Sequence, residues 1–396
     1  MSLAEPAVAS TVDSPSRLAF IDQLRALAAL YVAVFHAALV VWPDGGPRPP
    51  LWFRWADYGH FSVAVFIVLS GFSLALKPAM KDLASAGRYW YFMGRRALRM
   101  LPPYWVALAG SMVLLAFAPH GAANSHAGGI AGEWSGKGEV PLRSVFAFTF
   151  LVQDLVHVPS PNSPLWSIAV EWHLYFLFPL LVVLGCRYGM KWMVGGCMAV
   201  GIGLHFALWE TPAENTFPYF LGLFALGIGT AYAVAAARRS ERPRHEIARI
   251  SGWSLVAASV VVFAVITDPR RGAGSMRGAM IEMAADIIGS LVFAAGLYLM
   301  ATRSRSVDCP PRRPKVVERG ERVLAQIGLI SYSLYLVHSP TEKIVWHFVI
   351  SRLGVSPETS FVALAVAGVA TSVAVAAVLH LIIERRSIDW SRRVRL

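Results

Sequence analysis

Apolar runs long enough to cross a bilayer recur along the chain, with short polar segments between them. A transmembrane helix needs about 20 apolar residues, and each run has roughly that length. Helices satisfy their own backbone hydrogen bonds, which suits them to a membrane. The pattern predicts an all-α polytopic membrane protein with about ten transmembrane helices, at 20–42, 60–77, 101–118, 165–185, 192–209, 217–237, 251–267, 278–301, 323–339 and 359–383.

The predicted spans form one membrane domain over residues 18–386. A polar leader, 1–17, precedes it and lacks the basic start and apolar core of a signal peptide, so we expect the first span to remain as a helix. A basic cytoplasmic tail, 387–396, follows. The apolar segment 144–157 is too short for a span, and we expect it to be re-entrant or interfacial.

Composition and charge placement support this architecture. Hydrophobic residues make up 56% of the chain and charged residues 15%, which would expose too much apolar surface in a soluble protein. With both termini in the cytoplasm, the inner segments hold 26 of the 36 Lys and Arg residues and the outer loops hold nine. This positive-inside asymmetry predicts a multi-pass protein of the cell (cytoplasmic, inner) membrane.

The net charge of +12 does not indicate nucleic acid as a partner. The basic residues lie in juxtamembrane loops, where topology and contact with anionic membrane lipid account for them. The three cysteines are scattered and odd in number, so they predict neither a disulfide framework nor a metal site.

Arg25 and His36 lie inside the first predicted span, where a charged residue costs about 2.5–3.5 kcal/mol. They are eleven residues apart, which is about three helical turns and about 16 Å, so they share one face of the helix. This face predicts a polar cavity in which His36 is a general base and Arg25 holds an anionic group. The structural alternative is that Arg25 snorkels to the surface and His36 bonds to a carbonyl.

A second polar stripe begins just after Trp166. Ser167, Glu171 and Tyr175 are spaced four residues apart and therefore line one face of a helix. A carboxylate at this depth is costly unless it is paired or functional. Glu171 could orient an imidazole, shuttle a proton or pair with a buried arginine; a structural ion pair is the alternative.

Three arginines precede an aromatic pair on the predicted cytoplasmic side. Arg95, Arg96 and Arg99, with Tyr104 and Trp105, are suited to the phosphates and the base of a nucleotide-like cofactor. The alternative is a topogenic basic cluster on an interfacial helix.

Two further segments place polar residues inside predicted spans. Ser331, Tyr335 and His338 indicate a lining for a site, with Tyr335 and His338 on one face; an aromatic belt is the alternative. Ser70 lies beside Gly71 in the second span, where the pair indicates close packing or a further part of the lining.

Taken in order, these segments resemble the acyltransferase 3 family of integral membrane O-acyltransferases. The family has an Arg, ten residues and a His in its first span, and Arg25 and His36 fit this pattern. Similar motifs follow: FFxLSGF at 66–72, RRxxRxxPxYW at 95–105, WSLxxExxFY at 166–175 with Ile168 in place of Leu, and SYxLYLxH at 331–338. One departure is Glu384, which is followed by arginine where the family often has proline.

The resemblance implies transfer of an acyl group from acyl-CoA, with acetyl-CoA as the first candidate, to a hydroxyl of a cell-surface glycan, a glycolipid or a macrolide. It implies that His36 is the catalytic base and that Arg25 and Glu171 act beside it. Direct transfer and an acyl-histidine intermediate both stay open. Some members carry a hydrolase-like domain after the membrane part, so either this chain completes the transfer or a separate partner does.

Two other classes of protein have the same features. A polytopic transporter would also have a cavity lined by Arg, His and Glu, although the chain shows no inverted repeats. An inactive scaffold or sensor would keep its function after the substitution His36→Ala.

Overall fold

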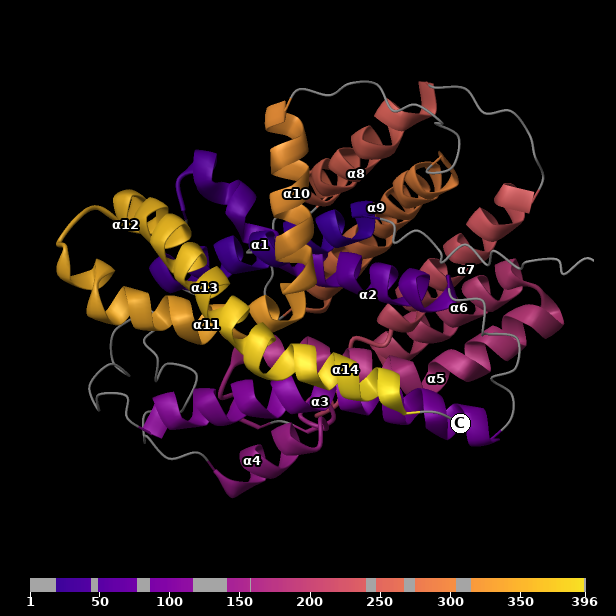
Figure 1. The fold of residues 1–396 in the computed structure, drawn as a ribbon, viewed down its shortest axis with the longest axis horizontal. Helices are drawn as coiled ribbons and strands as arrows, with labels where there is room; N and C mark the ends of the chain where they lie inside the picture. The colour runs from indigo at the N-terminus through magenta and orange to yellow at the C-terminus, as the bar shows by residue number, and fades with distance from the viewer. Residues whose placement is uncertain are drawn as a thin grey trace, which may run out of the picture.

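The computed structural model describes residues 19–43, 49–76, 86–116, 141–156, 158–239, 247–266, 275–303 and 315–394. Every regular element in these ranges is a helix, which confirms the all-α prediction (Figure 1). Eight helices in these ranges are long and apolar enough to cross a membrane. The chain is therefore a multi-pass membrane protein, while the count of about ten spans and the cytoplasmic termini stay predictions.

Seven predicted spans correspond to single helices. They are α1 (Ala19–Val41), α2 (Gly59–Ala75), α3 (Ala86–Ala116), α5 (Trp166–Tyr188), α6 (Met190–Ala207), α7 (Phe220–Arg239) and α9 (Met276–Arg303). The last span is one continuous helix that joins α12 (Pro357–Ala363), a π-helical turn (Leu364–Gly368), α13 (Val369–Leu379), a second π-helical turn (His380–Glu384) and α14 (Arg385–Arg393).

Two predicted spans differ in the structure. The prediction of one helix over 323–339 is wrong, because α10 (Lys315–Leu329) ends and α11 (Ser331–Phe348) begins on either side of Ile330. Figure 1 shows that the two helices run in different directions. The cause is packing on α1, since a Cβ atom at Gly328 would lie 2.0 Å from the carbonyl oxygen of Asp22.

The predicted span 251–267 corresponds to α8 (Ile247–Ile266), whose apolar part, Gly252–Val262, is shorter than a full span. The short segment 144–157 contains α4 (Leu142–Thr149), a helix of eight residues. Its expected re-entrant or interfacial position stays a prediction.

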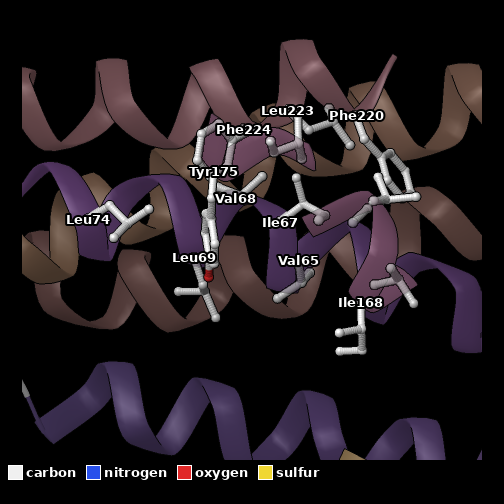
Figure 2. Packing of buried hydrophobic residues seen from close by; sticks show 14 of the residues in the cluster. Val65, Ile67, Val68, Leu69, Leu74, Ile168, Tyr175, Phe220, Leu223 and Phe224 are labelled. Atoms are coloured by element: carbon white, nitrogen blue, oxygen red, sulfur yellow. The ribbon is translucent and has the colours of Figure 1, made fainter. Parts of the chain in front are cut away.

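Glycines bring α2 and α7 into direct backbone contact. A Cβ atom at Gly71 would lie 2.2 Å from Phe224 O, and one at Gly227 would lie 2.1 Å from Val68 O. Figure 2 shows Leu223 and Phe224 packed over residues of α2 in the same cluster. Small residues of this kind let membrane helices approach closely. This contact fixes α2, which carries part of the site described below.

We therefore expect Gly227→Leu to destabilise the protein. The new side chain meets backbone atoms of α2, and overpacking of a core typically costs about 1–3 kcal/mol. Thermal unfolding of the detergent-solubilised protein measures the effect. Gly203→Leu is the control, because a Cβ atom there meets nothing within 4 Å. Equal unfolding temperatures for the two variants would contradict the close packing.

Candidate active site

Helix α1 lies between α2 and α11, so its two polar residues face different neighbours. Near its beginning, the Arg25 guanidinium donates from Nη2 to Ser73 Oγ of α2 at 3.1 Å. About three turns further on, His36 faces α11. The structure thus has an arginine centre and a histidine centre, separated by about 16 Å along α1.

The histidine centre is a pair of imidazoles from helices far apart in the sequence. His338 Nε2 lies 3.2 Å from His36 Nδ1, and the ring centroids are 4.8 Å apart. His338 Nδ1 lies 2.9 Å from Tyr335 O and 3.2 Å from Leu334 O. His36 Nδ1 also lies 3.0 Å from Val32 O.

These contacts assign the protons of both rings. His338 Nδ1 faces only carbonyl oxygens, so in the neutral ring this nitrogen carries the proton and Nε2 has a lone pair. His36 Nδ1 then faces two acceptors, the lone pair of His338 and Val32 O, and must also carry a proton. The basic nitrogen of neutral His36 is therefore Nε2, as a general base requires.

The stripe on α5 reaches the histidine centre through Ser167. Its hydroxyl lies 2.6 Å from the Tyr335 hydroxyl, which also donates to Pro164 O at 3.2 Å. The Tyr335 ring packs 5.6 Å from the His338 ring, centroid to centroid. The structure thus brings Ser167, Tyr335 and His338 together, and their role as site lining stays a prediction.

The other two residues of the stripe belong to the arginine centre. Ser70 and Tyr175 each donate to Glu171 Oε1 at 2.6 Å, and their hydroxyl oxygens are 3.0 Å apart. Ser70 is therefore a partner of the carboxylate as well as a packing residue. Both hydroxyls bind the same oxygen, so Ser70 and Tyr175 hold Oε1 of Glu171 in place.

Three guanidiniums gather near this carboxylate. Arg96 lies over the Tyr175 ring, 5.8 Å from its centroid, and interacts electrostatically with Arg99, as does Arg25. All three side chains are partly buried, and none forms a salt bridge with a residue in the described ranges. Glu171 attracts both Arg25 and Arg96, so one carboxylate faces a cluster of three guanidiniums.

The other predicted residues make contacts of their own, and of these Arg95 also repels Arg96. Arg95 donates from Nη1 to the Tyr91 hydroxyl at 3.2 Å. Tyr104 donates to Phe148 O at 2.8 Å and Trp105 to Thr149 O at 3.0 Å, so both hold α4 against α3. Ser331 donates to Gly328 O at 2.8 Å, at the junction of α10 and α11.

Trp166 lies in a separate cluster that the sequence did not reveal. Its ring stacks on His60 at 5.7 Å and packs on Phe217 at 4.6 Å, centroid to centroid. His60 Nδ1 lies 3.0 Å from Asp286 Oδ2, which also accepts from the Tyr219 hydroxyl at 2.7 Å. Because the aromatic rings pack against one another, we interpret this cluster as a polar part of the core between α2, α7 and α9.

Two buried carboxylates were also missed. Glu384, which is 2% exposed, accepts from Ser333 at 2.6 Å and lies 2.9 Å from His380 Nδ1. The His–Glu spacing of four residues in an apolar helix is a signal that could have found it. Glu342 is fully buried one turn beyond His338, and neither of its oxygens has a hydrogen-bond partner among the described residues.

The comparisons with known proteins decide the family. The sequence model of the acyltransferase 3 family, described as "Acyltransferase domain", matches residues 18–381. The chain belongs to the acyltransferase 3 family. Within the described ranges, no group of three or more His, Cys, Asp and Glu residues could hold a metal ion.

Several curated proteins are similar over the same region. The peptidoglycan O-acetyltransferase OatA of Listeria monocytogenes is 25% identical over 343 residues, which cover 81% of this chain and 48% of the relative. YrhL of Bacillus subtilis, named as a candidate peptidoglycan O-acetyltransferase, is 29% identical over 183 residues, 43% of this chain and 24% of the relative. The chain thus spans about half or less of these relatives. No solved structure matches it.

Proposed function

We propose that this protein is a membrane O-acyltransferase that moves an acetyl or short acyl group from acyl-CoA to a hydroxyl of a glycan. The observation that carries the proposal is the His36–His338 pair, which places a basic nitrogen inside a helical bundle about three helical turns from the arginine centre. The names of the relatives favour acetyl as the group and a glycan as the acceptor. A glycolipid or a macrolide offers the same hydroxyl chemistry.

The arginine centre is suited to the phosphates of the donor. Arg99 repels Arg25 and Arg96, and Glu171 offsets only part of the positive charge of the three guanidiniums, so a ligand that supplies further negative charge is favoured. Guanidiniums also bind phosphate oxygens in a bidentate manner. With the phosphates here, the pantetheine arm of CoA runs along α1 and brings the thioester towards His36, about 16 Å away.

At the histidine centre, His36 Nε2 takes the proton from the acceptor hydroxyl as its oxygen attacks the thioester carbonyl. The carbon–sulfur bond then breaks, the ester oxygen stays on the acceptor, and the CoA thiolate leaves with the proton that His36 returns. General base catalysis of this kind contributes about 10²–10⁴-fold. If the acyl group first moves to His36, Nε2 attacks the thioester carbonyl and the carbon–sulfur bond breaks to release the CoA thiolate. The acceptor oxygen then attacks the acyl carbon, the bond to Nε2 breaks, and the hydroxyl proton ends on the CoA thiolate.

His338 can share the positive charge that His36 acquires. When Nε2 of His36 is protonated, the proton on Nδ1 can move towards the lone pair of His338 Nε2, 3.2 Å away. The carbonyls of Leu334 and Tyr335 accept from the other nitrogen of His338 and stabilise its cationic form. A second imidazole thus takes the place that a carboxylate has in a catalytic triad.

We expect His338→Leu to lower acyl transfer by about 10–100-fold, because one charge-assisted hydrogen bond is lost. We expect His338→Gln also to lower it, because the proton can no longer move between the two side chains. Glutamine can accept from His36 Nδ1 but cannot take its proton. The measurement is the rate of acyl transfer as a function of the fraction of D₂O in the solvent. Wild type should give a curved plot, because two protons move in the transition state, and His338→Gln should give a straight line, because only one moves. Full activity of His338→Gln would show that His338 only positions His36.

Release of free CoA by the purified protein in nanodiscs tests the proposed function. Acetyl-CoA is offered with and without a soluble disaccharide of N-acetylglucosamine and N-acetylmuramic acid, and mass spectrometry follows the sugar. CoA release together with an acetylated sugar supports the proposal. Transport of the sugar into proteoliposomes without CoA release would instead favour a transporter, whose cavity would have the same residues.

A further inference from the structure

A large groove lies on the far side of α7 from the site. It has a volume of about 1040 Å³ and runs between α6, α7 and α9. Its walls are apolar and rich in small residues, such as Gly195, Ala233 and Ala294. Glycine and alanine at these positions leave open space where larger side chains would close the contact between helices.

The groove ends at a single charged residue among those that line it. Lys191 lies in the first turn of α6, is exposed, and forms no salt bridge with a described residue. Its ammonium lies 5.4 Å from the centroid of the neighbouring Trp192 ring. The hydroxyl-bearing residues Thr230, Tyr232 and Tyr298 line the same groove. The apolar walls of the groove are complementary to an acyl chain, and the cation and hydroxyls that line it are complementary to a charged phosphate. An anionic lipid has both parts.

We propose that this groove binds one anionic phospholipid, with an acyl chain between α6, α7 and α9 and the phosphate against Lys191. On the predicted topology Lys191 is on the cytoplasmic side, where anionic lipids attract basic residues at membrane helix ends. The inference is independent of the proposed enzymatic function, because it rests on the groove and its charge alone.

Helix α7 connects this groove with the site. One face of α7, with Leu226, Gly229 and Ala233, lines the groove. The opposite face, with Gly227, contacts α2, the helix that carries Ser70 and Ser73. A lipid chain in the groove therefore packs against the face of α7 that is opposite to α2. We expect this contact to raise the thermal stability of the protein when the anionic lipid is bound.

The chain offers a matched pair of variants. A Cβ atom at Gly195 or at Gly196 would meet nothing within 4 Å, so a side chain can begin at both positions without a clash. Only Gly195 lines the groove. Gly195→Leu fills the groove, and Gly196→Leu adds the same side chain to the same helix outside it. Lys191→Gln removes the charge and keeps the groove.

The experiment is native mass spectrometry of the delipidated full-length protein, titrated with phosphatidylglycerol or phosphatidylcholine. We expect wild type and Gly196→Leu to bind one phosphatidylglycerol tightly, and Gly195→Leu to bind it at least tenfold more weakly. Lys191→Gln should lose about fivefold, the effect of one basic residue at a charged surface, and should no longer prefer phosphatidylglycerol.

Three results would overturn the proposal. Equal binding of phosphatidylglycerol to Gly195→Leu and Gly196→Leu would place the lipid elsewhere. Equal affinity of wild type for the two lipids would remove the role of the charge. A dimer that is lost only in Gly195→Leu would identify a second copy of the chain as the occupant.

Discussion

Replacement of His36 by alanine is expected to lower acyl transfer by about 10²–10⁴-fold, the usual contribution of a general base. The variant loses the nitrogen that takes the hydroxyl proton, while the arginine centre about 16 Å away stays intact. Affinity for acetyl-CoA should therefore stay at the wild-type value. Steady-state turnover and isothermal titration with CoA, on the same preparation, measure the two quantities separately.

A second histidine of α11 provides the control for this result. His347 packs edge-on against Phe348 and takes no part in the histidine centre. We expect His347→Ala to keep wild-type turnover and CoA affinity. If His36→Ala also kept its turnover, neither a base nor an acyl carrier at His36 would be tenable, and another residue would have to take the hydroxyl proton.

The sequence was sufficient for features that depend on helical periodicity. The spacing of eleven between Arg25 and His36 places both on one side of α1, and the spacing of four puts Ser167, Glu171 and Tyr175 in one stripe. Both patterns are properties of a single helix, so they need no knowledge of its neighbours. The structure adds only which neighbour each residue meets.

Contacts between helices could not be predicted in this way. His36 and His338 are 302 residues apart, and their pairing depends on α1 lying beside α11. The break at Ile330 likewise depends on α10 packing against α1 through Gly328. Hydropathy alone makes 323–339 look continuous, because it does not register where a partner helix redirects the chain.

Local motifs also group residues that the fold separates. Tyr104 and Trp105 follow the arginines closely in sequence, yet both hydrogen-bond to the backbone at the end of α4. Residues three or four apart share a helix face, whereas Arg96 and Trp105 are nine apart with two prolines between them. Proximity in a motif therefore did not imply a common site.

A substitution in the arginine centre is expected to weaken CoA binding and to stabilise the ligand-free protein. We expect Arg99→Met to weaken CoA binding by about 10–100-fold, because one charge-assisted contact to phosphate contributes about 1.5–3 kcal/mol. The same substitution should stabilise the ligand-free protein. Methionine keeps the apolar stem of the side chain but removes a partly buried charge that repels Arg25 and Arg96 and has no carboxylate partner.

CoA titration and thermal unfolding without ligand measure the two effects. A gain of about 1 kcal/mol corresponds to an unfolding temperature about 1–2 °C higher in a chain of 396 residues. Arg319→Met, at an exposed position of α10, is the control and should change neither quantity. Weaker binding together with lower stability would mean that Arg99 is a structural residue. A higher unfolding temperature together with weaker CoA binding would mean that the three arginines are kept close together for the sake of the anionic ligand. Their mutual repulsion lowers the stability of the ligand-free protein and is offset when the anion binds.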